Sequence, residues 1–337
     1  MSEYQYYEFA AIDRPLTAAE MAQLRKVSTR GQISASSFVN HYEWGGLKAD
    51  PAEWMRRYFD AFVYTANWCS CRLSLRLPLA TFHETDLRPF VSGAALTIEA
   101  SDEHWIIDWS LYESENYDRF NVEDGGGWMG RLAPLRDELL RGDLRPPYLG
   151  WLASAGQLDD DLLEPQPPAG LSELTLSQQA LTEFIEVDPD LLAAAAAGSP
   201  RAAAEDSAQA AAIDAWLAEW SREEMAAVLK LVALGQGREA EHRMRTLRAT
   251  WLKAQRPTTA ASAPQRCMAQ LRELARSASG VRRALQAQEL ALKEAESHRQ
   301  REASLRLLMA DVGRAWPAHC DHRRQWLRTG SIRSHRA

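Results

Sequence analysis

Apolar and polar residues alternate in several short stretches of the first 112 residues, a pattern typical of strands that bury one face. The clearest alternation covers residues 69–77, where cysteine and leucine side chains share one face and serine and arginine side chains share the other. Residues 4–11 and 32–44 also read as extended, and the stretches 94–100 and 104–112 flank a turn. The pattern therefore predicts strands, the last two of them paired as a hairpin.

Two helix starts are marked by capping residues. Thr17 is followed three residues later by Glu20, which predicts a capping box. Asp50 precedes a proline, the arrangement of an N-cap before the first helical residue. We expect the second helix to be long, because aromatic and β-branched residues recur along it at helical spacing. These residues are Trp54, Tyr58, Phe62 and Thr65.

The order of strands and helices predicts an α+β fold, in which a mixed sheet carries helices on one face. The rest of the chain is expected to be all-helical and to end in a long helical hairpin or coiled-coil-like arm. The expected divisions are 1–127, an α+β aromatic-rich domain; 128–192, short helices with a Pro/Asp-rich linker; 193–212, an Ala-rich linker; 213–316, the helical hairpin arm; and 317–337, a basic disordered tail after Trp316.

The last helix carries an apolar stripe whose members are spaced alternately three and four residues apart, which is a heptad pattern. We call these positions the seam: Leu271, Leu274, Ala278, Val281, Leu285, Gln288, Leu292 and Ala295. Two interpretations stay open. The seam can pack against residues 238–256 in an intramolecular hairpin, which we favour, or residues 271–312 can form an oligomer through an intermolecular coiled coil.

Composition divides the chain in the same way. All nine tyrosines and seven of the eight phenylalanines lie in the first 150 residues, and beyond Phe184 the only aromatic residues are tryptophans. Net charge is −8 over residues 1–127, −9 over 128–213 and +10 over 214–337. The basic last third is therefore expected either to fold back on the acidic part or to face an acidic partner.

Motifs with a known chemistry are weak in this chain. Cys69 and Cys71 form one Cys-x-Cys without a second pair, and they lie on the apolar face of a strand, where thiols pack as small hydrophobes. The run from His319 to His322 has ligand-type side chains without a distant partner. Glycines 125–127 precede a helix but lack the Lys-Ser/Thr of a phosphate-binding loop. We expect no metal site and no cofactor.

Catalysis has three weak candidates. His41 and Glu43 are two residues apart, so a strand would place them on the same side, and His104 lies beside acidic residues in a turn. Such pairs are common by chance, so an enzyme is the less favoured class. Aromatic residues near loops are candidate partner contacts, because tryptophan and tyrosine dominate binding hot spots, although filling the core explains each of them equally well. They are Tyr42, Trp44, Trp105, Trp109 and Trp128.

Basic residues decorate the polar side of the helix expected over 238–256. Arginine-rich helices bind phosphate backbones, but they also form solvated faces paired with acidic residues, and acidic residues are interspersed here. The candidate nucleic-acid contacts are Arg238, Arg243, Arg245, Arg248, Lys253 and Arg256.

The N-terminal sequence resembles an uncharacterised family of bacterial proteins. The likeness rests on the opening from Tyr4 to Thr17, on the stretch from Ser36 to Gly45, and on residues 58–68, and it is clearest over about the first 150 residues. The resemblance implies a bacterial, cytoplasmic setting and no particular activity, cofactor or site.

Together these patterns predict a cytoplasmic protein, since no apolar run has the roughly 20 residues that a membrane span needs and the N-terminus has no signal-peptide pattern. We expect a non-enzymatic protein–protein interaction, scaffold or adaptor component with an unidentified protein partner and no membrane partner. The alternatives are a nucleic-acid-associated protein that uses the basic helices and an enzyme of unknown class around His41 and Glu43.

Overall fold

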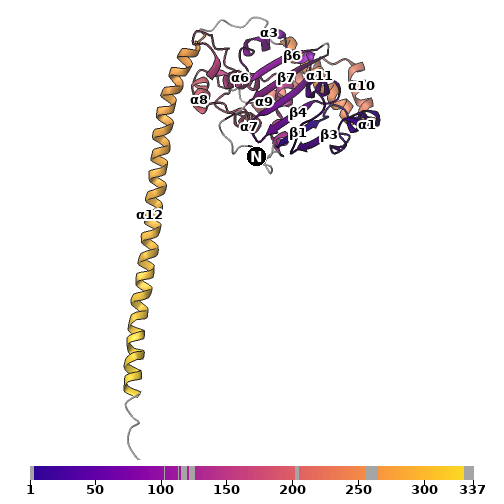
Figure 1. Cartoon of the computed structure of the whole chain (residues 1–337). Helices are drawn as coiled ribbons and strands as arrows, with labels where there is room; N and C mark the ends of the chain where they lie inside the picture. Colours follow the sequence, from indigo (N-terminus) through magenta and orange to yellow (C-terminus); the bar gives the residue numbers. More distant parts are fainter. Residues whose placement is uncertain are drawn as a thin grey trace, which may run out of the picture. The chain divides into compact units, whose positions relative to one another are not determined.

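The computed structural model describes residues 4–101, 103–112, 114, 120, 126–201, 205–255 and 265–329, apart from the side chains of 205–210, 281, 286 and 307–329. Its contacts divide the chain into two units, Met1–Arg276 and Ser277–Ala337. We call the first unit the body and the second the arm (Figure 1).

Within the described residues, seven strands of the body form one sheet in the order β2-β3-β1-β4-β5-β7-β6. Every pairing between neighbouring strands is antiparallel. The α+β class is thus confirmed, but the sheet is antiparallel and not mixed, because alternation specifies the faces of a strand and not its direction. The strands are β1 Gln5–Ala10, β2 Gln32–Ile33, β3 Ser37–Tyr42, β4 Ala61–Ala66, β5 Cys71–Pro78, β6 Leu96–Ala100 and β7 His104–Leu111.

The two helix starts predicted from capping residues are both present. Thr17 makes a capping box with Glu20, and Asp50 accepts a hydrogen bond from the backbone amide of Ala52. The helices are α1 Ala18–Val27, α2 Pro51–Arg57, η1 Leu79–Thr81, α3 Glu84–Leu87, η2 Arg88–Phe90, α4 Trp128–Leu132, α5 Leu135–Leu140, α6 Arg145–Ala153, η3 Ala155–Gln157, α7 Leu176–Phe184, α8 Pro189–Ala197, α9 Glu205–Ala218, α10 Arg222–Ala233, α11 Gly237–Gln255 and α12 Met268–Thr329.

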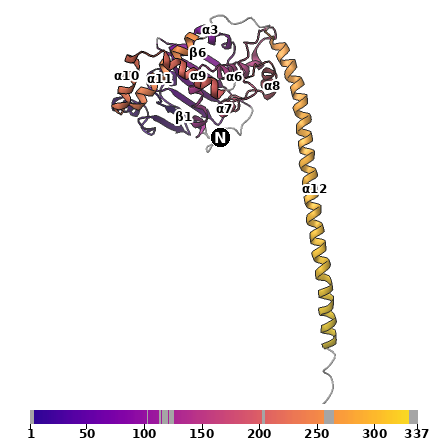
Figure 2. The same ribbon diagram turned by 180° about the vertical axis from the view of Figure 1, so that it is seen from behind.

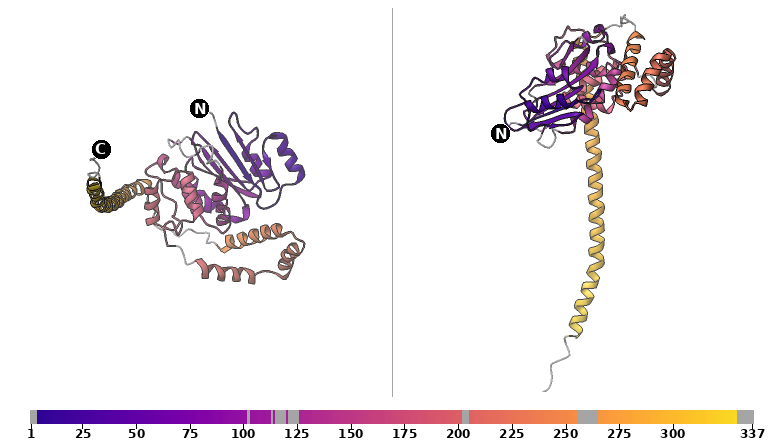
Figure 3. Two further views of the ribbon diagram at one scale, coloured as in Figure 1. Left: turned by 90° about the horizontal axis from the view of Figure 1, so that it is seen from below. Right: turned by 90° about the vertical axis from the view of Figure 1, so that its right-hand side faces the viewer.

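Both faces of the sheet are covered. Phe9, Phe38 and Phe62 belong to one buried cluster with residues of α1 and α2, whereas Val63 and Leu73 belong to a second cluster with the helices that follow residue 127. Figure 3 (left) shows the indigo helix and the magenta helices on opposite sides of the sheet. The prediction of helices on one face was wrong. Side chains on both faces of strand β4 are buried, so both faces of the sheet must be covered by other elements.

The second predicted helix is much shorter than its pattern suggested. α2 ends at Arg57, and Phe62 and Thr65 lie in strand β4. Aromatic and β-branched residues favour strands, and the pairing of β4 with both β1 and β5 overrides their helical spacing. The hairpin of β6 and β7 forms as predicted.

Residues 128–201 do not form a separate domain or linker. Helices α4 to α8 share one buried cluster with the sheet, and the indole Nε1 of Trp109 in β7 donates to the carbonyl of Pro146 in α6 at 3.0 Å. The expected Pro/Asp-rich linker is also fastened, since Glu164 accepts from Arg266 Nε at 2.7 Å. The boundary predicted at residue 127 therefore cuts through a single core, and α8 and α9 occupy most of the expected Ala-rich linker.

Helix α11 belongs to the body. It packs against α10, against η1 and against α5 (Figure 2). The intramolecular hairpin that we predicted between residues 238–256 and the last helix stays a prediction, because α11 belongs to the first unit and the seam from Ala278 onward belongs to the second. Within the first unit, Ala240 and Ala249 of α11 are almost fully buried.

The last helix is longer than expected. We predicted that it ends near Trp316, but α12 continues through Pro317 as far as Thr329. Proline removes one backbone hydrogen bond of a helix and often kinks it, but residues on both sides can keep a helical backbone. The residues after 329 lie outside the described part of the chain.

Candidate interaction surfaces

His104 is not brought together with the other two candidate catalytic residues, His41 and Glu43. His41 is exposed in β3, where it stacks on Tyr4 with ring centroids 6.1 Å apart, and Glu43 is exposed just beyond that strand. His104 begins β7, which is four strand spacings from β3, or roughly 19 Å. Burial, followed by the charge of Arg76, lowers the pKa of His104. No pair of these residues across the sheet can therefore share a substrate.

Three of the five candidate aromatic contacts fill the core. Trp105, Trp109 and Trp128 are each less than a tenth exposed, so they are not available to a partner. Tyr42 is half-buried and packs edge-on against a neighbouring tyrosine. Trp44 is 73% exposed in the turn after β3 and remains a candidate. The alternation of the strands could have separated Trp44 from the others, because the pattern aims Trp105 and Trp109 at the same face as the apolar residues.

The basic side of α11 is partly turned toward the acidic body. Arg245 lies 3.6 Å from a carboxylate oxygen of Asp137, and Lys253 Nζ donates to the carbonyl of Leu79 at 3.3 Å. Arg248 is half-buried, and this burial lowers its pKa. Arg238 and Arg243 are exposed, while Arg256 lies outside the described residues. We expected the basic third either to fold back on the acidic part of the chain or to face an acidic partner. Helix α11 follows the first of these expectations.

A buried charge cluster fastens α11 to the sheet. Asp13 Oδ2 accepts from Arg136 Nη2 at 2.6 Å and lies 3.2 Å from His242 Nδ1. The hydrogen bond to Asp13 is the largest of the effects that raise the pKa of His242. Burial alone would raise the pKa of Asp13, but the combined action of His242 and Arg136 holds it well below its usual range. Both shifts favour the charged forms of Asp13 and His242.

A second buried pair lies beside the first. Asp60 Oδ1 accepts from Arg76 Nη2 at 2.7 Å, while its other oxygen accepts from the backbone amides of Ile12 and Asp13 at 2.6 and 2.9 Å. Arg136 Nε donates to the backbone carbonyl of Arg76 at 2.8 Å, which links the two pairs. Sequence reasoning missed this cluster, because it placed Arg76 on the polar face of a strand that we expected to be solvated.

Helix α10 exposes apolar side chains beside the buried Val228. Val228 is buried, but Met225, Leu229 and Val232 are 42%, 66% and 56% exposed. Their spacing of four and three residues places them on one side of the helix. We call this surface the α10 stripe.

The seam of α12 begins in the body and then becomes exposed. Leu271 is fully buried in the body and Leu274 is 43% exposed. Within the arm, Leu285 and Leu292 are 56% and 61% exposed. Among the arm's described side chains, ion pairs one turn apart include Glu302 with Arg306 at 3.9 Å.

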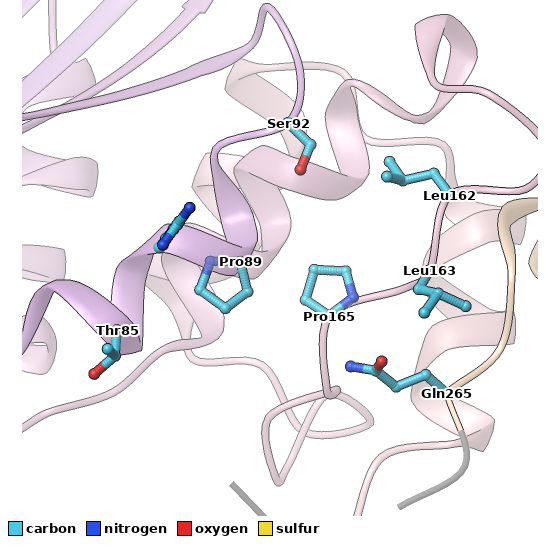
Figure 4. A pocket seen from close by; sticks show the side chains of 8 residues that line it. Thr85, Pro89, Ser92, Leu162, Leu163, Pro165 and Gln265 are labelled. Carbon is cyan, nitrogen blue, oxygen red and sulfur yellow. The ribbon is translucent and has the colours of Figure 1, made fainter. Parts of the chain in front are cut away.

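One open pocket of about 410 Å³ lies where η2 approaches the segment 162–165 (Figure 4). It is lined by Thr85, Arg88, Pro89, Ser92, Leu162, Leu163, Pro165 and Gln265. The lining offers one cation and no acid–base or nucleophile–base pair, so it does not form a catalytic constellation.

Metal-binding clusters and membrane-spanning helices are both absent from the described part of the chain. The described side chains contain no group of three or more histidine, cysteine, aspartate or glutamate residues placed to hold a metal ion. Cys71 packs in the core instead, and its thiol donates to the carbonyl of Phe184. Among the helices in the described part of the chain, none has the combination of length and apolarity required to cross a membrane.

Comparison of the chain with protein-family models gives no match, and neither does comparison with curated proteins or with solved structures.

Proposed function

We propose that the protein is a non-enzymatic interaction component that assembles with a partner through the seam of its arm. The observation that carries this proposal is the exposure of Leu285 and Leu292, one heptad apart, on a helix of 62 residues. A helix of this length extends about 93 Å, far beyond the usual three to four turns of helices in globular proteins.

The energetic argument concerns the exposed leucines. Complete burial of a leucine side chain contributes about 1.5–3 kcal/mol, and each of these side chains still exposes more than half of its surface. Most helical stability in proteins comes from packing an amphipathic face, and the described residues of the body use only the first turns of α12 in this way. A partner helix on the seam would supply the missing burial.

The α10 stripe supports an interaction role for the body as well. Helix α10 buries Val228 but leaves the apolar residues beside it, Met225, Leu229 and Val232, exposed. An apolar surface of this kind marks protein–protein contact sites.

The nucleic-acid alternative has less support. Phosphate binding needs cations that are free to approach a backbone, whereas Arg245 and Lys253 contact the body. The enzymatic alternative has less support because His41 and Glu43 are exposed and His104 lies across the sheet from them.

The proposal is tested by affinity capture of the full-length chain from its source cells, with and without nuclease, followed by mass spectrometry. Two double variants are compared with the wild type. Leu285→Glu with Leu292→Glu disrupts the seam, and Ala287→Glu with Ser297→Glu adds the same charge at positions that the heptad directs outward.

We expect a stoichiometric protein partner, which can be a second copy carrying a different tag, to survive nuclease treatment. It should be lost from the seam variant and kept by the control variant. A partner kept by both variants contradicts the role of the seam. A partner lost on nuclease treatment instead assigns the contact to nucleic acid and to the exposed Arg238 and Arg243.

A further inference from the structure

We infer that the seam of the arm pairs with the same seam of a second copy of this chain, in antiparallel orientation, with the centre of the pair between positions 286 and 287. This inference rests on the proposed function and names the partner. It follows from three features of α12: the exposure of its leucines, the order of large and small residues in the seam, and the charges that flank it.

Within the arm, the seam runs from Ala278 to Ala295 in steps of three and four residues. Leu285 and Gln288 are the first and last residues of one three-residue step of the seam. In an antiparallel pair of helices, the first residue of such a step contacts the last residue of a three-residue step in the other helix. With the centre between 286 and 287, Leu285 faces Gln288 of the second copy, and Leu292 faces Val281 of the second copy. The glutamine, which is the one polar residue in this part of the seam, then packs on a leucine rather than on another glutamine.

A parallel, in-register pair is less favourable for the same residues. It would place Gln288 against Gln288 and, one heptad beyond Leu292, Arg299 against Arg299 of the second copy. Like charges that face each other in a seam oppose pairing, so they disfavour the parallel arrangement.

The flanking charges select the antiparallel register more sharply. Arg282 and Glu289 each follow the second residue of a three-residue step, so both occupy the same flank of the seam. In the antiparallel register, Arg282 of each copy lies beside Glu289 of the other, and the symmetry gives two such pairs. In the parallel register, Arg282 would face Ser277 and Glu289 would face Ala284, so neither charge would meet an opposite charge.

The first part of the test is sedimentation equilibrium of the full-length chain with reversed charges. Arg282→Glu should raise the dissociation constant of the dimer roughly tenfold or more, because it creates two glutamate–glutamate contacts. Arg282→Glu combined with Glu289→Arg should restore the wild-type value. Arg283→Glu makes the same change of charge at a position directed away from the seam, and it should leave the dimer within about twofold of wild type.

The second part measures orientation by pulsed dipolar spectroscopy. A spin label is attached at Ser304→Cys, an outward position, in a chain that also carries Cys267→Ser and Cys320→Ser. With a rise of 1.5 Å per residue, the two labels of an antiparallel pair should be roughly 50 Å apart. In a parallel pair they should be within about 25 Å, because the helix axes are only 8–10 Å apart.

The three outcomes separate the inference from the function on which it rests. A distance near 50 Å together with rescue by the double charge reversal supports the antiparallel pair. A short distance, or a failure of the rescue, overturns the register while leaving assembly through the arm intact. An absence of dipolar coupling in a monomeric chain overturns pairing with a second copy, and a different protein lost from the seam variant would then still support the proposed function.

Discussion

Replacing Asp60 by asparagine should destabilise the body strongly, whereas the equivalent change at Glu99 should have almost no effect. Both carboxylates accept from an arginine at nearly the same distance: Asp60 Oδ1 from Arg76 Nη2 at 2.7 Å, and Glu99 Oε1 from Arg56 Nη2 at 2.8 Å. They differ in burial. The side chains of the Asp60 pair are 1% and 9% exposed, and those of the Glu99 pair are 55% and 36% exposed.

The magnitude follows from this difference. Removing one charge of a buried ion pair leaves the other charge without compensation and costs about 3–5 kcal/mol, whereas exposed pairs contribute about 0–1 kcal/mol. Asparagine is close in shape to aspartate, and its oxygen can still accept from the backbone amides of Ile12 and Asp13. Its NH₂ group, however, would meet the donors of Arg76. The cost of Asp60→Asn is therefore electrostatic and does not come from a cavity.

The assay is urea unfolding followed by tryptophan fluorescence, since ten of the twelve tryptophans lie in the body. We expect the midpoint of Asp60→Asn to fall by a large fraction of its wild-type value, because domains are stable by only about 5–15 kcal/mol. The midpoint of Glu99→Gln should move by less than the equivalent of about 1 kcal/mol. Equal effects of the two substitutions would refute the reasoning, since burial would then not decide the contribution of these pairs.

Three further predictions concern other contacts of the body. The contribution of His242 to stability is measured as the difference in free energy of unfolding between wild type and His242→Gln. This difference should be complete below about pH 6.5 and should decline as pH rises through the raised pKa of His242, because the protonated ring pairs with Asp13. A difference that grows with pH would contradict this. Gly150→Ala should cost about 1–3 kcal/mol, because its Cβ would lie 2.7 Å from a tryptophan ring carbon, whereas Gly130→Ala, with no atom within 4 Å, should stabilise helix α4 by about 0.5–1 kcal/mol in the same unfolding assay. Trp44→Ala should change the free energy of unfolding by less than about 0.5 kcal/mol, and a larger loss would show that this side chain has a structural rather than a surface role.

Local signals in the sequence predicted local structure well. Thr17 and Asp50 mark helix starts because capping depends on residues two or three positions away, and the structure confirms both. The strand at residues 71–78 and the hairpin that follows are confirmed for the same reason, since alternation is a property of each strand by itself.

Features that depend on distant residues were not predictable in this way. Phe62 has helical spacing with Trp54, but strands β1 and β5 pair on both sides of it, and those partners decide its structure. The charge cluster joins Asp13 to Arg136 across 123 residues of sequence, so no short window contains it. The packing partners of α11 were likewise not predictable, because its own apolar stripe does not identify α10, η1 and α5 as the elements that it contacts.

The candidate surfaces follow the same division. The heptad seam of α12 was legible in the sequence, because its period is local. Which of its residues remain exposed was not, since that depends on where the body stops covering the helix, between Leu271 and Leu285. The α10 stripe was missed because its residues lie beside the buried Val228 and have the spacing of ordinary core positions.

Sedimentation equilibrium of the full-length chain, alongside the variant with Leu285→Glu and Leu292→Glu, tests assembly through the arm most directly. Pairing of two seams predicts a species of twice the 37.9 kDa chain mass for the wild type and a monomer for the variant. A wild-type chain that remains monomeric up to about 100 μM, or a variant that dimerises as tightly as wild type, would contradict it.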